Sequence, residues 1–205
     1  MKILSFISRK GGTGKTTNAI NLATTLHQRG NKVLLVETDT NYTLNTLRKI
    51  ESAREKNVTT FDIVGSQDAT IAEELQQVKQ NNRYDFVIVD SAGKTTDEGI
   101  KKLCLVSDAA IVPTSLTQND LLVTYQTVTD LLPAQKLNPA LKILILPNRI
   151  HSFTRQKTAT ETLSKIQAIV LPVMVPQKNA FVNFSTVEAE KEYQIIADQI
   201  LLHIQ

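Results

Sequence analysis

The chain has 205 residues, 41% of them hydrophobic and 21% charged, and a formal net charge of +3, a balance typical of a globular domain with a buried core. Its single cysteine, Cys104, excludes an internal disulfide and any metal site built from several cysteines. No hydrophobic run has the length of a membrane span or of a secretory signal, so we expect a cytoplasmic protein that does not bind membranes.

Short hydrophobic runs alternate with amphipathic segments along the chain, which predicts a single α/β domain over residues 1–205. The predicted strands are Lys2–Ile7, Lys32–Val36, Phe86–Val89, Ala109–Val112, Lys142–Leu146 and Val170–Val173, with a weaker one near Val58–Ile63. The predicted helices are Lys15–Gln28, Thr43–Arg54, Ala69–Gln80, Thr96–Leu105, Gln118–Leu132, Arg155–Ile169 and Val187–Ile204. Several strands are continuously apolar, which indicates a doubly wound, mostly parallel sheet with helices on both faces.

The first strand leads into a glycine-rich loop and then a helix. The loop reads Lys10-Gly11-Gly12-Thr13-Gly14-Lys15-Thr16-Thr17. Glycines let backbone N–H groups turn toward phosphate oxygens, and the N-terminus of the following helix attracts anions, as in P-loop proteins. We therefore expect the loop to bind ATP with Mg²⁺: Lys15 at the β- and γ-phosphates, Thr16 at the metal and Thr17 at the α-phosphate. Arg9 stands where the general pattern has glycine.

The second lysine of the loop, Lys10, makes the motif resemble the deviant Walker A motif of the ParA/MinD ATPases. The resemblance implies a homodimer that closes on ATP, in which Lys10 contacts the nucleotide of the partner subunit. A second cation there would offset charge developing on the transferred phosphoryl group, as Lys15 does within its own subunit. Without the resemblance, Lys10 would be interpreted as a solvent-facing lysine of the loop.

Two acidic segments follow later strands. Glu37-Thr38-Asp39-Thr40-Asn41 is similar to the family segment Asp-x-Asp-Pro-Gln, which implies that Asp39 positions the attacking water near the metal. Glu37 replaces the first acid, and Thr40 and Asn41 replace Pro-Gln, so the effect of these changes stays open. Either acid could instead cap a helix or form a loop salt bridge.

The strand Phe86–Val89 ends at Asp90, the Walker B pattern, in which a buried strand places one carboxylate beside Mg²⁺. Gly93 follows three residues later, where related switch loops sense the γ-phosphate. The segment Asp90-Ser91-Ala92-Gly93 resembles the small, single-domain ParA subgroup that includes ParF-like and VirC1-like proteins.

Two further residues are candidates for adenine binding. Asn148 follows the strand Lys142–Leu146 and resembles the family residue whose amide reads the adenine edge, although a plain turn asparagine after Pro147 is the alternative. Pro176 belongs to a segment that packs against adenine in relatives.

Basic residues concentrate in the C-terminal half. Residues 131–187 contain seven basic side chains and one acid, Glu161, so this stretch has a net charge of +6 and the remainder −3. The asymmetry fits a basic face that binds a polyanion, and it fits a lysine-rich solvated surface equally well. The candidate DNA contacts are Arg149, Arg155, Lys157, Lys165 and Lys178.

These sequence features are compatible with three classes of function. The resemblance and the basic stretch favour a nucleoid-associated ParA-type partition ATPase. In such a protein the ATP-bound homodimer binds non-specific DNA, and a ParB-type centromere-binding activator stimulates hydrolysis and so releases the dimer. The alternative is a MinD-like membrane-positioning ATPase, but Val187–Gln205 is acidic in its first half, unlike a basic lipid-binding helix. A metabolic relative of the nitrogenase iron protein would need a cluster-binding cysteine pair, which Cys104 does not supply.

Overall fold

The computed structural model describes residues 1–39, 43–54, 60–67, 69–93, 96–181, 183 and 185–204. The strands are β1 (Lys2–Phe6), β2 (Val33–Glu37), β3 (Asp62–Gly65), β4 (Phe86–Asp90), β5 (Ala109–Thr114), β6 (Lys142–Pro147) and β7 (Ile169–Val170). The helices are α1 (Lys15–Gln28), α2 (Thr43–Arg54), α3 (Ile71–Asn81), α4 (Asp97–Val106), α5 (Gln118–Leu137), α6 (Gln156–Leu163) and α7 (Tyr193–Leu202), with a 3-10 turn η1 (Asn179–Phe181) before α7.

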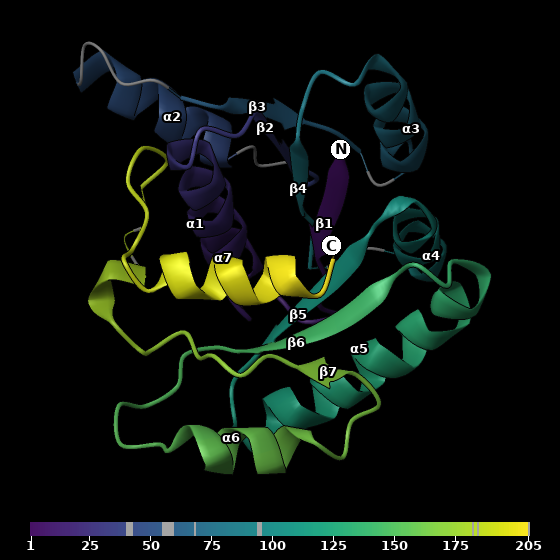
Figure 1. The fold of residues 1–205 in the computed structure, drawn as a ribbon, viewed down its shortest axis with the longest axis vertical. Helices are drawn as coiled ribbons and strands as arrows, with labels where there is room; N and C mark the ends of the chain where they lie inside the picture. The colour runs from purple at the N-terminus through teal and green to yellow at the C-terminus, as the bar shows by residue number, and fades with distance from the viewer. Residues whose placement is uncertain are drawn as a thin grey trace.

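All seven strands pair in parallel and form one sheet in the order β3-β2-β4-β1-β5-β6-β7 (Figure 1). β1 lies in the middle, between β4 and β5. The strand order changes direction here, because β2, β3 and β4 lie on one side of β1 and β5, β6 and β7 on the other. Doubly wound sheets bind ligands outside the carboxyl ends of the strands at such a point, so the fold itself marks the end of β1.

Helices cover both faces of the sheet. α1 and α7 contact each other on one face, and α3, α4 and α5 form a contiguous layer on the other (Figure 1). Leu4 and Phe6 of β1 belong to the core under α1 and α7, whereas Ile3 belongs to the core under α4 and α5. Side chains alternate between the faces of a strand, so a strand covered on both faces is apolar throughout. The predicted doubly wound fold is thereby confirmed.

The edge strands differ most from the sequence prediction. β7 has only two residues, Ile169–Val170, in place of the predicted Val170–Val173. Pro172 has no N–H to donate, which ends the ladder just after β7. The weak strand predicted near Val58–Ile63 is β3, shifted toward the C-terminus, and residues 58 and 59 lie outside the described residues.

α6 is shorter than the predicted helix Arg155–Ile169, because it ends at Leu163. The chain turns there, with the Ile166 N–H donating to the Leu163 carbonyl at 3.0 Å, and the turn buries Ile166 in the core. Burial of an apolar side chain outweighs the modest helix propensity of the residues that follow.

α7 begins at Tyr193 and not at Val187. A helix that began at Val187 would use the Glu190 N–H internally, but Asn21 Oδ1 accepts this N–H at 2.8 Å. Such side-chain hydrogen bonds compete with helix formation. Among the helices of the described residues, none combines the length and apolarity needed to cross a lipid bilayer.

Candidate nucleotide site

The glycine-rich loop connects the buried end of β1 to α1 at the middle of the sheet. Gly12 and Gly14 have φ angles of 75° and 96°, in the left-handed region where a residue with a Cβ is strained. Gly14 caps α1, and the first turn of that helix contains no acidic side chain. The loop therefore presents backbone N–H groups and the positive end of a 14-residue helix to the same space, the arrangement that binds phosphate.

Lys15 is buried at the start of α1, and its ammonium donates to the carbonyl of Lys10 at 3.3 Å across the loop. Burial disfavours the charged form and lowers the pKa of Lys15, while the carboxylates of Asp90 and Asp39 partly oppose this. The ammonium of Lys15 thus lies over the loop, and the two acids favour its charged form. It is positioned to contact the phosphates of a nucleotide.

Asp90, at the end of β4, is the buried acid of the site. Burial raises the pKa of Asp90 to about 7, although a hydrogen bond from Thr16 and the charge of Lys15 act against it. Its Oδ1 atom is buried without a hydrogen-bond partner among the described residues. A buried, unpartnered carboxylate oxygen beside a threonine hydroxyl is the donor chemistry that Mg²⁺ prefers, so Asp90 and Thr16 fit the metal that accompanies ATP.

The two acids after β2 have separate environments. Glu37 is buried, and its carboxylate accepts from the backbone N–H of Leu44, in the first turn of α2, at 3.2 and 3.3 Å. Burial raises the pKa of Glu37, and these backbone donors partly oppose the rise. Of the two interpretations open for Glu37, the structure therefore supports helix capping. Asp39 is exposed and acts electrostatically on Lys15 and Asp90, while Thr40 and Asn41 lie outside the described residues.

The segment after β4 packs directly on the glycine-rich loop. A Cβ atom on Gly93 would lie 3.1 Å from the Cα of Gly11, closer than ordinary van der Waals contact. The Ala92 N–H donates to the hydroxyl of Thr38, at the end of β2, at 2.9 Å. The segment thus connects the acidic segment after β2 to the glycine-rich loop, which is where a γ-phosphate sensor is expected.

Lys10 faces an acid that sequence reasoning missed. Its ammonium donates to Asp120 Oδ1 at 2.7 Å, and Asp120 also accepts from the Ser115 hydroxyl. Burial alone would raise the pKa of Asp120, but the hydrogen bonds from Lys10 and Ser115 outweigh it and the pKa is lowered. Thr117 was the sequence signal that could have identified this acid. A threonine there predicts the start of a helix, and Asp120, three residues later, then lies in the first turn of α5.

Arg9, where the general pattern has glycine, connects the loop to two helices. Its guanidinium pairs with Asp97 at the start of α4, at 2.6 Å, and with Asp130 of α5. Its backbone N–H donates to the Thr127 hydroxyl at 3.3 Å. These contacts hold the beginning of the loop against the α4–α5 layer.

A cavity of about 230 Å³ opens beside the loop, and its wall includes Gly14, Thr17, Asn148 and Pro176. The structure therefore brings the loop and both adenine candidates together. Asn148 is buried and its side-chain amide donates to the Thr13 carbonyl at 2.7 Å, so it braces the loop. Its contact with adenine stays a prediction.

The five candidate DNA contacts divide into two groups. Arg149 and Lys178 line the cavity beside the loop, and Lys178 pairs with Glu192 at the start of α7. Arg155, Lys157 and Lys165 are exposed on or beside α6. The first two therefore lie beside the glycine-rich loop, and the last three lie at α6 and do not line this cavity.

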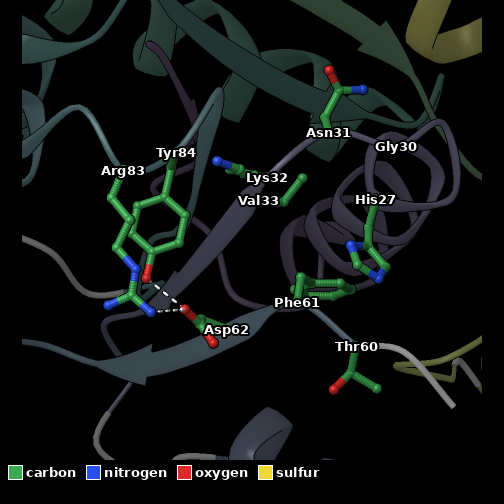
Figure 2. A pocket seen from close by; sticks show the side chains of 10 residues that line it. All are labelled: His27, Gly30, Asn31, Lys32, Val33, Thr60, Phe61, Asp62, Arg83 and Tyr84. Carbon is green, nitrogen blue, oxygen red and sulfur yellow. Dashed lines mark hydrogen bonds and ion pairs between the residues drawn. The ribbon is translucent and has the colours of Figure 1, made fainter. Parts of the chain in front are cut away.

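A second cavity, of about 440 Å³, lies away from the loop, at the amino ends of β2 and β3. In Figure 2 the rings of Phe61 and Tyr84 stand on either side of Asp62. The Tyr84 hydroxyl donates to Asp62 at 2.5 Å, and Arg83 lies 3.9 Å from the same carboxylate (Figure 2). Because these polar groups already pair with one another, this cavity offers less to a ligand than the glycine-rich loop.

Comparison with known proteins places this geometry in a family. A model of the VirC1 protein family matches residues 1–189. Protein virC1 of Rhizobium rhizogenes is 27% identical over 180 residues, covering 84% of this chain and 76% of the relative. The maintenance of carboxysome distribution protein A of Halothiobacillus neapolitanus is 25% identical over 193 residues, covering 94% and 87%.

Solved structures share the fold. A plasmid partition protein from Borrelia burgdorferi superposes with a TM-score of 0.69 at 22% identity, covering 99% of each chain. The MinD cell division protein of Aquifex aeolicus superposes with a TM-score of 0.71 at 19% identity, covering 98% of this chain and 96% of that one. The chain thus belongs to the VirC1 family and has the fold of the ParA/MinD group, as its glycine-rich loop indicated.

Proposed function

We propose that this protein is an ATPase of the ParA type that hydrolyses ATP to ADP and phosphate. The observation that carries the proposal is the buried, unpartnered carboxylate oxygen of Asp90 next to Thr16 and Lys15, at the end of the glycine-rich loop. Leaving a carboxylate unpaired in a protein interior costs stability, which is typical of a site that a ligand completes. A purely structural role for the loop gives no reason for this cost.

Each residue has a distinct task in the proposed reaction. The loop amides, Lys15 and Thr17 bind the phosphates, Thr16 and Asp90 hold Mg²⁺, and Asp39 orients the attacking water. The bound metal supplies charge neutralisation on the β- and γ-phosphates. Asn148 and Pro176 border the space for adenine.

We further propose that ATP closes a homodimer in which Lys10 contacts the nucleotide of the partner subunit. Lys10 is only partly buried and lies at the rim of the loop, paired with Asp120. In the dimer its charge would face the transferred phosphoryl group, where a fixed cation stabilises the transition state. Mass measurement with a non-hydrolysable ATP analogue tests this: the wild type should dimerise and Lys10→Ala should dimerise less. Equal dimerisation of the two proteins would remove the cross-subunit role.

The proposed work of the ATPase is the partition of DNA. The ATP-bound dimer would bind DNA without sequence preference through Arg155, Lys157 and Lys165, and a ParB-type activator would stimulate hydrolysis and release it. The exposure of these three cations on or beside α6 supports this, because phosphate contacts provide most non-specific affinity. The plasmid partition protein among the structural relatives is compatible with it. DNA retention at increasing salt, with and without nucleotide, is the test, and equal retention without nucleotide would contradict the switch.

The packing of α7 disfavours the MinD-like alternative. Tyr193, Ile196 and Ile200 are buried against the sheet and α1, so these apolar side chains are not free to enter a lipid surface, although Ile195 and Leu202 of the same helix are exposed. A helix that binds lipid needs a free apolar face and a basic polar one. Flotation with anionic vesicles distinguishes the two functions, since ATP-dependent recovery with the vesicles would favour the MinD-like function.

A further inference from the structure

Phe153 is the most exposed of the large hydrophobic side chains in the described part of the chain, at 89%. It lies in the β6–α6 turn, which we define as residues 151–155. The next most exposed, Leu122, reaches 64%. A single exposed apolar residue is ordinary, so exposure alone does not indicate a contact.

Local hydrogen bonds fix the shape of the turn and hold Phe153 at its outer end. The Thr154 N–H donates to the His151 carbonyl at 2.8 Å, and the Phe153 N–H faces His151 Nδ1 at 3.4 Å. The rings of His151 and Phe153 lie 5.3 Å apart between centroids, tilted by 36°. Ile150, just before the turn, is buried. The phenyl ring is thus presented to solvent by a turn anchored on one side in the core.

Two exposed cations follow the ring closely in the sequence. Arg155 directly follows the turn at the cap of α6, Lys157 lies two residues further, and both are exposed. Glu161, which lies 3.8 Å from Lys157, is the only acid between residues 131 and 187. Proteins bind single-stranded nucleic acid with exposed aromatic rings and nearby cations: the ring stacks on a base and the cations contact the backbone.

The same short segment reaches the nucleotide site. Asn148 braces the glycine-rich loop through Thr13, and Arg149 lines the cavity beside it. Arg149 has a φ angle of 56°, a left-handed conformation that is unfavourable for a residue with a side chain. Strained backbone of this kind is concentrated at functional sites. Only three residues separate Arg149 from Phe153, so a short stretch of backbone joins the exposed ring to the wall of the cavity beside the loop.

We propose that the β6–α6 turn binds unpaired bases, with the ring of Phe153 stacking on a base and Arg155 and Lys157 contacting the flanking phosphates. This inference rests on the proposed nucleotide-dependent DNA binding and deepens it by naming a preference for single strands. It also revises the expectation that DNA is bound through basic residues alone.

The test compares two labelled ligands by fluorescence anisotropy, in the presence of a non-hydrolysable ATP analogue: an oligo-dT of about 16 nucleotides and a duplex of equal length. Phe153→Ala should weaken binding to the single strand by about 5- to 150-fold, the range for loss of one stacked base. Phe153→Trp should retain it. Leu137→Ala, at a residue 63% exposed at the far end of α5, is the matched control and should bind like the wild type.

Salt titration separates stacking from charge. Phe153→Ala should leave the slope of log affinity against log salt unchanged, whereas Lys157→Ala should reduce the slope by about one on both ligands. Unchanged affinity of Phe153→Ala for the single strand, or an equal loss on single strand and duplex, would overturn the stacking contact and leave the ATPase and its DNA binding intact. A wild type that binds neither ligand in either nucleotide state would instead refute the proposed DNA function, and this inference with it.

Discussion

The ammonium of Lys10 donates to the carboxylate of Asp120 at 2.7 Å, so the lysine that characterises the loop motif is held within its own subunit. To contact the nucleotide of the partner subunit in the proposed dimer, Lys10 would have to break its ion pair with Asp120. The pair is partly exposed, and exposed ion pairs contribute about 0–1 kcal/mol. Asp120 would therefore oppose the proposed dimerisation only weakly.

We expect Asp120→Ala to raise the ATP-dependent association constant of the dimer by up to about thirtyfold, because the Lys10 of each subunit no longer has to break an ion pair and two pairs of at most about 1 kcal/mol are involved. Analytical ultracentrifugation with an ATP analogue measures it. Asp198→Ala removes the comparable exposed partner of Arg29, 2.7 Å away and distant from the loop, and should leave association unchanged. Weaker association of Asp120→Ala than of the wild type would show that this acid supports the dimer.

Asp120 also predicts a pH dependence of stability. Its pKa is lowered in the folded chain by the hydrogen bonds from Lys10 and Ser115, from about 3.9 in the unfolded chain. A lowered carboxyl pKa stabilises the fold above the unfolded pKa, and this contribution is lost as the pH falls through the folded value. The wild type should therefore be more stable than Asp120→Asn near neutral pH, by about 1 kcal/mol or less, and the difference should begin to shrink below about pH 4 and disappear only below the lowered folded pKa. Urea unfolding across this range measures it, and a difference independent of pH would contradict the assignment.

Asp90 predicts opposite effects on stability and activity. Its buried oxygen lacks a partner among the described residues, so Asp90→Asn removes an ionisable group from an environment that disfavours charge. We expect the nucleotide-free variant to be more stable by about 1 kcal/mol, as at other strained functional sites. ATP hydrolysis should fall by about 10- to 100-fold, the range for loss of a group that orients a bound metal. Thermal unfolding and phosphate release measure the two effects, and a variant that is both less stable and fully active would show that Asp90 has a structural role.

Asn148 and Asn138 can be compared as variants, because the side-chain amide of each donates to backbone carbonyls. Asn148 is buried and Asn138 is partly buried. Asn148 donates to the Thr13 carbonyl in the loop, whereas Asn138 donates to the carbonyls of Cys104 and Ser107, away from the site. Replacing either with alanine leaves carbonyls unpaired and should destabilise the fold by about 1–3 kcal/mol.

Nucleotide affinity should separate these two variants. Asn148→Ala should weaken ATP binding by about tenfold, the effect of about 1.4 kcal/mol, because the loop loses its brace. Asn138→Ala should bind as the wild type does. Fluorescent nucleotide titration at a temperature where both variants are folded measures this. Equal weakening in both would mean that the effect comes from stability and not from the loop.

The fold was predictable because its signals are local. Uninterrupted apolar runs such as Ile143–Leu146 identify strands covered on both faces, and the glycine-rich sequence before Lys15 identifies the loop and the start of α1. Element ends were less predictable, because side chains distant in sequence decide them. Asn21, for example, accepts the N–H of Glu190 and so delays the start of α7.

The partners of site residues could not be deduced, because they come from other elements. The Lys10–Asp120 pair joins residues 110 positions apart. Glu37 had two open interpretations, and only the position of α2 over its carboxylate favours capping. Arg149 and Lys178 were grouped with the DNA candidates by charge, although the packing of β6 against the segment after β7 puts them beside the loop.

Isothermal titration of the purified chain with ATP and Mg²⁺ tests the central claim most directly. The wild type should bind one nucleotide per chain in a Mg²⁺-dependent manner, and Lys15→Ala should lose most of this affinity, because the buried ammonium no longer faces the phosphates. Absence of any binding heat for the wild type at temperatures on both sides of 25 °C, or equal binding by Lys15→Ala, would contradict the account.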